Sequence, residues 1–375
     1  MKPAARLNAL IIALILTAGG LPVSAESDER WHRMVATEFG DRSVLEWQTL
    51  EGLPTPGEGE VRLRVLAASA SFTDVMVRKG LYGEINEEPP LVPGYDLVGV
   101  IDEVGPGVEG FSKGDRVADL SVWGAYTEYA IRPATHLVPV PDSVDAVEAV
   151  SLILSYTTAY QMLHRVAQVE SGDDILVHGA SGAVGSALTQ LARLDDITVF
   201  GTASARKHEY VSSLGAIPID YRSQDFVVEV GAATNAQGVD AAFDAIGLEN
   251  FKRSYETLSD DGLLVTYGLY RSTLDAEAGS MWSLASEFIG FQWQQLLWRW
   301  FGDGNRDVTF YSITRMRDAQ PDWFLNDLAT LFELLATGKI TPNVWKVMPL
   351  EEAAEAHRLI EQGEVQGKIV LKVAD

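Results

Sequence analysis

The sequence predicts an α/β protein in which a mostly β domain accompanies a doubly wound parallel sheet. Three observations lead to this fold class. The chain has 375 residues, 47% of them hydrophobic, which is enough for two domains with their own cores. Residues 35–141 contain short β-type runs separated by Gly and Pro. From residue 146 onward, short apolar runs alternate with helical stretches, as in a parallel sheet covered by helices.

Three strands are predicted in the first half of the chain. Residues 61–66 alternate apolar and polar side chains, as a half-buried strand does. Residues 97–101 and 114–117 are short segments bounded by glycine turns, and each predicts a short strand.

The second half alternates between the two kinds of element. A helical stretch at 146–166 opens it. Strands are predicted at 175–178, 197–200, 241–244 and 263–267, and helices at 183–194 and 207–214. The tail predicts an amphipathic helix before Gly338, a second helix at 350–362 and a closing strand at 368–373.

The first residues have the layout of a secretory signal. Lys2 and Arg6 precede the apolar run 7–16, and residues 23–25 have the small-residue spacing of a signal-peptidase site. The run is too short for a membrane span of roughly 20 residues. The alternative is a translation start near Met34, so residues 1–33 are set apart from the fold.

Charge and cysteine content exclude several classes of function. Lys and Arg number 29 against 53 Asp and Glu, so the formal charge is −24. Such a chain repels phosphate backbones, which argues against a nucleic-acid partner. Cysteine is absent, which excludes disulfides and thiolate catalysis.

The strongest motif lies between a predicted strand and a predicted helix. It reads Ala180-Ser181-Gly182-Ala183-Val184-Gly185, with alanine at the first glycine position of the dinucleotide-binding fingerprint. Gly182 lets the backbone approach a pyrophosphate, and Gly185 lets the helix pack closely on the sheet. The N–H groups at the helix start then face the phosphates. This context predicts dinucleotide binding.

The next strand predicts which dinucleotide is bound. An NAD site usually carries an acidic residue at the end of that strand. Here the strand is followed by Ser204 without an acid, and then by Arg206 and Lys207; Tyr221 follows a later short strand. Hydroxyl and cationic groups suit a 2′-phosphate. The sequence therefore favours NADPH over NADH, the alternative being an ordinary solvated helix start.

At this point the chain resembles the medium-chain dehydrogenase/reductase superfamily over residues 34–375. Within it, the chain is similar to the branch of quinone oxidoreductases and synaptic-vesicle proteins. The resemblance depends on the glycine motif and on segments in the family's order: 92–96, 154–160, 219–222, 243–247 and 367–371.

The resemblance implies the domain organisation. A GroES-like β domain at 34–155, completed by residues 310–375, would enclose a Rossmann domain at 156–309. The cleft between the two would hold the nicotinamide and a small-molecule substrate. Thr73 and Thr158 match positions near the nicotinamide, and Gly247 and Gly268 match cofactor-binding positions.

The departures from the family concern zinc. Zinc alcohol dehydrogenases of this superfamily hold the metal through a Cys and a His-Glu pair. Those positions correspond here to Ser71 and to Tyr95-Asp96. Neither Ser nor Tyr is a normal zinc ligand, and a catalytic site needs three good protein ligands. We therefore expect no metal.

Without a Lewis acid, the expected reaction is NADPH-dependent hydride transfer to a quinone or an α,β-unsaturated carbonyl. Tyr82 is the candidate proton or hydrogen-bond donor, since related enoyl-thioester reductases are thought to use a tyrosine there. The alternative is a tyrosine packed at a loop edge. Thr73 is the second candidate catalytic residue. Two other functions stay open: an enoyl-thioester reductase, or a non-catalytic NADPH-binding module associated with membranes or lipids.

Residues 288–301 concentrate aromatic side chains. Such a segment can line an apolar cleft, form a dimer contact or touch a membrane. Because relatives carry a comparable segment between the last Rossmann strands, we expect a cleft wall or a homodimer contact, with weak membrane contact as the alternative.

Overall fold

The computed structural model describes residues 30–277, 281–301 and 305–373. Most of the signal-like segment therefore lies outside the described residues. The first strand, β1 (Arg30–Ala36), includes residues 30–33, so these four residues belong to the fold and not to the signal-like segment with which they were predicted to lie. It pairs with β2 (Leu45–Glu51) in an antiparallel hairpin, and the Trp31 side chain is buried.

The first domain is built on a seven-stranded sheet. Its order is β14-β15-β3-β4-β5-β7, and β6 pairs with β3. The closing strand pairs antiparallel with β3, Ile369 opposite Ala70, so the end of the chain completes the first domain. The strands are β3 (Glu60–Ala70), β4 (Leu97–Val104), β5 (Arg116–Asp119), β6 (Tyr129–Pro133), β7 (Val138–Pro139), β14 (Val344–Pro349) and β15 (Lys368–Lys372).

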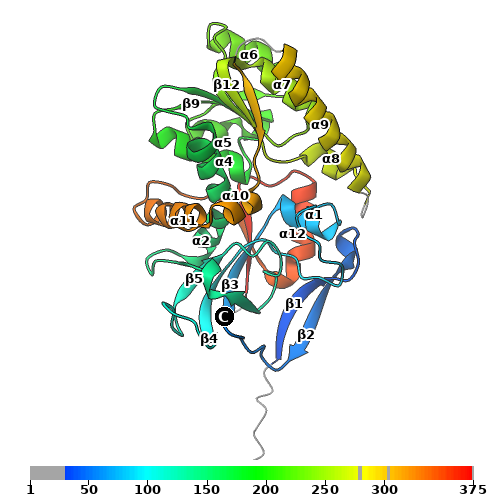
Figure 1. The fold of residues 1–375 in the computed structure, drawn as a ribbon, viewed down its shortest axis with the longest axis vertical. Helices are drawn as coiled ribbons and strands as arrows, with labels where there is room; N and C mark the ends of the chain where they lie inside the picture. The colour runs from blue at the N-terminus through cyan, green and yellow to red at the C-terminus, as the bar shows by residue number, and fades with distance from the viewer. Residues whose placement is uncertain (1–29, 278–280, 302–304, 374–375) are drawn as a thin grey trace, which may run out of the picture.

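The second domain is a six-stranded parallel sheet with helices on both faces (Figure 1). Its order is β10-β9-β8-β11-β12-β13, so the direction of winding reverses between β8 and β11. Ligands of such sheets bind at the carboxyl ends of the strands, at this reversal. The strands are β8 (Asp174–Val177), β9 (Thr198–Ala203), β10 (Ile217–Asp220), β11 (Val239–Asp244), β12 (Leu258–Thr266) and β13 (Asp307–Phe310).

The predicted helix at 146–166 is three consecutive elements, namely α2 (Ala146–Ile153), α3 (Ser155–Tyr160) and the π-helical turn η3 (Gln161–Ala167). The remaining α-helices are α1 (Phe72–Arg78), α4 (Ala183–Leu194), α5 (His208–Ser213), α6 (Phe226–Ala233), α7 (Leu248–Glu256), α8 (Tyr270–Asp275), α9 (Met281–Phe301), α10 (Ile313–Ala319), α11 (Pro321–Ala336) and α12 (Ala353–Glu361). Within the described residues, no helix has the length and apolar character needed to cross a membrane.

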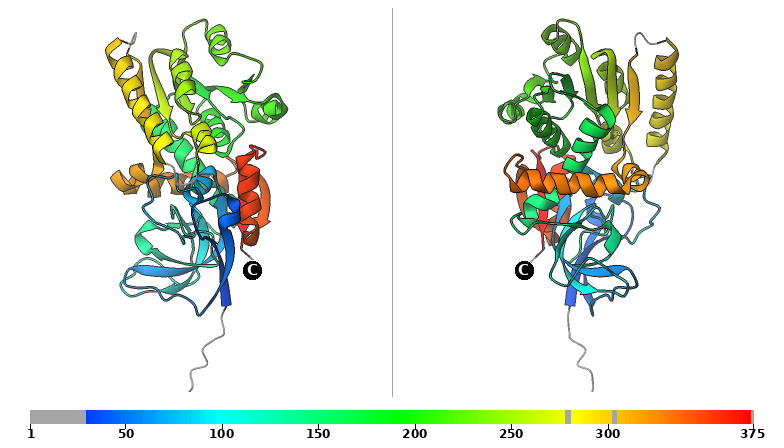
Figure 2. Two further views of the ribbon diagram at one scale, coloured as in Figure 1. Left: turned by 90° about the vertical axis from the view of Figure 1, so that its right-hand side faces the viewer. Right: turned by 60° about the vertical axis from the view of Figure 1, so that its left-hand side comes forward.

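One apolar core runs through both domains. It joins Tyr95 and Val98 of the first domain to Ile175 and Val177 of β8. The helix α11 lies across the junction in both views of Figure 2, and its Leu328 belongs to the same core. Burial of this shared core holds the carboxyl ends of the parallel strands against the first domain.

Candidate active site

The glycine motif forms a tight loop between β8 and α4, with Gly182 at the helix N-cap. A Cβ on Gly185 would lie 2.4 Å from the carbonyl oxygen of Gly179 and 2.7 Å from the Cα of Ala180. Both neighbours are backbone atoms and cannot rotate away. Glycine at 185 therefore permits the close packing of helix on loop that the fingerprint predicts.

Ala180 contributes through its backbone. Its side chain is fully buried against β9, where a Cβ on Gly201 would lie 2.7 Å from it. Its N–H donates to the carbonyl of Thr202 at 3.0 Å. Ala183 and Val184, by contrast, are half-buried on the first turn of α4. The predicted phosphate-binding residues thus lie together, with Ala180 beneath the others.

The end of the chain braces this loop. The N–H of Gly367 donates to the carbonyl of Ser181 at 3.0 Å, and Gly182 forms a parallel bridge with Gly367. The loop is therefore held from both domains.

The end of β9 carries the predicted 2′-phosphate residues. Ser204 is buried, and the side chains of Arg206 and Lys207 donate to backbone carbonyls in the segment 363–365. Burial, and then the neighbouring Arg206, lower the pKa of Lys207. Two adjacent cations whose hydrogen bonds go to neutral carbonyls would gain from a bound anion, so this corner fits a phosphate.

Tyr221 stands in solvent at the next strand end, 54% exposed, with the Arg222 guanidinium 5.7 Å from its ring. Gly247 is the N-cap residue of α7, after β11, at φ 143°. Gly268 follows β12, where a Cβ would lie 3.1 Å from that of Ala245. All three lie after strand ends on the side of the sheet where the glycine loop lies, as a cofactor site requires.

A buried polar chain beneath the loop was not predicted. The N–H of Gly179 donates to Thr202 Oγ1 at 3.2 Å, and His178 Nδ1 lies 3.1 Å from the same oxygen. On the other side of the ring, Nε2 lies 2.9 Å from Ser254 Oγ, which donates to Asp244 Oδ2 at 2.6 Å. Burial lowers the pKa of His178, so a neutral ring links the loop to the Asp244 carboxylate.

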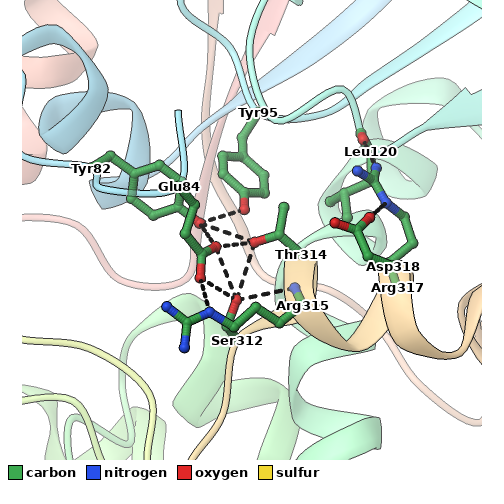
Figure 3. A network of polar contacts seen from close by, with 9 residues as sticks. All are labelled: Tyr82, Glu84, Tyr95, Leu120, Ser312, Thr314, Arg315, Arg317 and Asp318. Atoms are coloured by element: carbon green, nitrogen blue, oxygen red, sulfur yellow. Dashed lines mark hydrogen bonds and ion pairs between the residues drawn. The ribbon is translucent and has the colours of Figure 1, made fainter. Parts of the chain in front are cut away.

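Tyr82 lies at the centre of a second network, which joins the segment 82–95 to the segment 312–315 (Figure 3). Its hydroxyl donates to Glu84 Oε2 at 3.0 Å and lies 2.7 Å from the hydroxyl of Tyr95. Because a phenol carries one proton, Tyr95 must donate to Tyr82. Thr314, just inside α10, lies 3.5 Å from the Tyr82 hydroxyl and joins the network from a segment more than 200 residues further along the chain.

Both phenols stay protonated. Burial, Tyr95 and Glu84 raise the pKa of Tyr82 well above the ordinary phenol value. Burial raises the pKa of Tyr95 to about 12. Tyr82 is therefore held as a protonated hydrogen-bond donor within this network.

The other two residues expected near the nicotinamide lie in different surroundings. Thr73 is half-buried in the first turn of α1 and lies outside the network of Figure 3. Thr158 is buried in α3 beside Tyr311. Burial raises the pKa of Tyr311, and a hydrogen bond with Thr158 partly offsets this rise.

A cavity of about 370 Å³ adjoins the Tyr82 network. Glu84 and Thr314 line it, so the network reaches the cavity wall. Its charged wall residues are Glu84, Glu87, Arg315, Arg317 and Asp318. Its volume is in the range of small-molecule sites.

The positions where relatives hold zinc are engaged in other contacts. The Ser71 hydroxyl donates to Asp74 Oδ2 at 2.7 Å, and Tyr95 contacts Tyr82. Asp96 is fully buried and accepts from the N–H groups of Ser69 and Leu154, at 3.2 and 3.1 Å. Among residues 30–277, 281–301 and 305–373, no cluster of three or more His, Cys, Asp or Glu could hold a metal.

Two family descriptions match the chain: alcohol dehydrogenase GroES-like domain at residues 57–142, and zinc-binding dehydrogenase at 214–371. The human synaptic vesicle membrane protein VAT-1 homolog is 33% identical over 349 residues, covering 90% of this chain and 85% of that protein. The chain belongs to the medium-chain dehydrogenase/reductase superfamily. Within this superfamily it falls in the quinone oxidoreductase and VAT-1-like branch, which confirms the predicted family.

Two further members of the superfamily extend the comparison. A 2-haloacrylate reductase of Burkholderia sp is 32% identical over 331 residues, covering 87% of this chain and 94% of that protein. The Escherichia coli quinone oxidoreductase complexed with NADPH superposes with a TM-score of 0.78 at 26% identity, covering 91% of this chain and 99% of that one. The GroES-like domain and the Rossmann sheet predicted from the sequence are thus confirmed.

Proposed function

We propose that this oxidoreductase uses NADPH to reduce a quinone or an α,β-unsaturated carbonyl, and that it does so without zinc. The observation that supports this most directly is the Tyr95–Tyr82 pair. Tyr95 occupies a position where zinc-dependent relatives have a metal ligand, and its hydroxyl lies 2.7 Å from that of Tyr82. Two phenols can stabilise an oxyanion by hydrogen bonding, but they cannot replace a Lewis acid in forming an alkoxide.

The residues present fit NADPH. The first turn of α4, opened by Gly182, would hold the pyrophosphate. Arg206 and Lys207 would exchange their backbone carbonyl partners for the 2′-phosphate, with Ser204 and Tyr221 beside them. When bound, NADPH supplies the hydride. The relative from Escherichia coli was solved with this cofactor, which supports the assignment.

The Tyr82 hydroxyl would donate to the carbonyl oxygen of the acceptor, where negative charge develops. Tyr95 donates to Tyr82 from a fully buried position, which makes the Tyr82 proton a better hydrogen-bond donor. Thr73 and Thr158 are proposed to flank the nicotinamide. The buried His178 chain would hold the glycine loop in place.

The charges of the cavity favour a neutral acceptor. Glu84 pairs with Arg315 at 3.0 Å, and Arg317 approaches Asp318 at 3.8 Å. Glu87 adds a further negative charge at the wall. An acceptor carboxylate would therefore meet a slightly acidic wall, which favours quinones and enones over acids such as the haloacrylate named for the Burkholderia relative.

The aromatic segment forms α9, which presents Trp282, Trp293 and Trp300 to solvent at 78%, 63% and 70% exposure. Its Phe291 packs inward on Phe251, with ring centroids 5.2 Å apart. The cavity beside Tyr82 is lined by other segments, so the cavity wall does not depend on α9. A homodimer through α9, or weak membrane contact, stays a prediction.

The proposal is tested by NADPH oxidation with the full chain and a panel of quinones, enones, unsaturated acids and enoyl thioesters. We expect saturable turnover that prefers NADPH and neutral acceptors. Tyr82→Phe should lower kcat about 10²-fold and leave the Kd for NADPH unchanged. Tyr160→Phe is the matched control, because that tyrosine packs on His164, 4.4 Å away, outside the network.

Two outcomes would contradict the proposal. Turnover with enoyl thioesters alone would favour the enoyl-thioester reductase. NADPH binding without turnover on any acceptor would favour the non-catalytic module.

A further inference from the structure

The Glu84 carboxylate is surrounded by hydrogen-bond donors from two segments that are far apart in the sequence (Figure 3). Tyr82 donates to it at 3.0 Å and Arg315 Nε lies 3.0 Å away. The hydroxyl of Ser312 donates at 2.8 and 2.9 Å to its two oxygens, and Thr314 donates as well. In the absence of substrate, these four donors therefore stabilise the negative charge of the Glu84 carboxylate.

Two of these donors converge on a single oxygen. The hydroxyls of Tyr82 and Thr314 both donate to Oε2 of Glu84. Two positioned donors aimed at one negative oxygen is the arrangement that stabilises an oxyanion in a transition state. Thr314 is itself buried, so the competing water that would weaken such donors is largely excluded.

The single proton of Tyr82 makes this contact exclusive. Tyr95 already donates to Tyr82, so Tyr82 can donate to only one other oxygen. In the structure that oxygen is Oε2 of Glu84. An acceptor carbonyl can receive the same proton only by taking the place of Oε2.

We propose that Glu84 occupies the oxyanion site as an internal anion, that the carbonyl oxygen of the acceptor displaces it, and that Thr314 is a catalytic residue that donates to this oxygen together with Tyr82. The inference deepens the proposed reduction and depends on Tyr82 contacting the acceptor. It assigns Glu84 a role in acceptor affinity, since Glu84 competes with the substrate oxygen for both donors.

The surroundings of Glu84 allow it to leave. Its side chain is 18% exposed and lines the cavity, so it can move into that space. Arg315 is 68% exposed and can follow, which keeps the carboxylate paired outside the site. The three remaining donors are the hydroxyls of Tyr82, Ser312 and Thr314, which are less exposed than Arg315 and stay behind.

Glu84→Ala empties the site and makes it available to a small carboxylate. With the full chain, sodium acetate should raise the acceptor KM of Glu84→Ala severalfold without changing kcat, whereas the wild type should not respond. Sodium chloride at equal concentration controls for ionic strength. Glu88→Ala is the matched variant, because it removes an exposed carboxylate from the same loop.

A second readout does not need turnover. Acetate should raise the Tm of Glu84→Ala and leave that of the wild type and of Glu88→Ala unchanged, because only an emptied site binds the added anion. This result with an inactive wild type would reject the proposed reductase and retain the anion site. Equal effects of acetate on wild type and Glu84→Ala, in both assays, would overturn the inference.

Thr314 is tested by a pair of substitutions. Thr314→Val removes the hydroxyl at similar volume and should lower kcat by about 10²-fold, while NADPH affinity stays unchanged. Thr314→Ser keeps the donor and should restore most of kcat. Wild-type kcat in Thr314→Val would show that Thr314 only supports the fold.

Discussion

Gly185→Ala tests whether the glycine loop and α4 must touch. A Cβ there would lie 2.4 Å from the carbonyl oxygen of Gly179, and such contacts are not seen below 3.0 Å, so the backbones must separate by about 0.6 Å. Such overpacking costs about 1–3 kcal/mol. Alanine regains about 0.5–1 kcal/mol over glycine within a helix. The net loss expected is therefore about 0–2.5 kcal/mol.

Gly231→Ala in α6 is the matched control, since a Cβ there meets nothing within 4 Å. It should stabilise the protein by about 0.5–1 kcal/mol. Urea unfolding gives the change in unfolding free energy for each variant, provided that the two m-values are equal. The difference between the two changes isolates the cost of overpacking. NADPH titration should show weaker binding, on the order of tenfold, for Gly185→Ala only. Equal stability and equal NADPH affinity in the two variants would refute the close-approach argument.

Two further predictions concern cofactor choice and pH. Arg206→Ala should lower kcat/KM for NADPH about 10-fold or more, the value of a charged hydrogen bond, and leave that for NADH unchanged; equal losses with both cofactors would contradict the 2′-phosphate contact. Because burial raises the pKa of Tyr95 from 10 to about 12, the stability that this shift represents is present below pH 10 and lost as pH rises through about 12. Because both phenols stay protonated, the kcat of the wild type should not decline below pH 10 through ionisation of Tyr82. A decline below pH 10 in the wild type that is absent from Tyr82→Phe would contradict this prediction.

Local signals in the sequence predicted much of the Rossmann domain. The strand before the glycine motif is β8, and the predicted helix 183–194 has the same bounds as α4. These elements are determined by periodicity and by glycine in one short segment. The stretch 146–166 was less accurately predicted, because its continuous apolar pattern does not show that the backbone changes to a π-helical turn at residue 161.

The polar networks could not be predicted in the same way. Tyr82 was selected through the family resemblance, but its partner Thr314 lies 232 positions further along the chain. The link from His178 to Ser254 spans 76 positions. The first contact depends on where α10 packs against the segment around Tyr82, and the second on how α7 packs against the parallel sheet, and no local pattern encodes either. Among the residues that the sequence did select, those of the glycine motif and those after β9, β10, β11 and β12 lie at strand ends, where topology alone brings them together.

The two networks divide the work of the site between rigid and movable parts. The His178 chain is buried from end to end and joins three strand ends, which suits a loop that must keep its N–H groups fixed for a phosphate. Around Tyr82 the buried members are Tyr95 and Thr314, whereas Glu84 and Arg315 face the cavity. On the proposed mechanism, the fixed donors stay aimed at one point while the anion beside them exchanges. Catalysis then needs only that the acceptor oxygen bind where Glu84 Oε2 lies in the free protein.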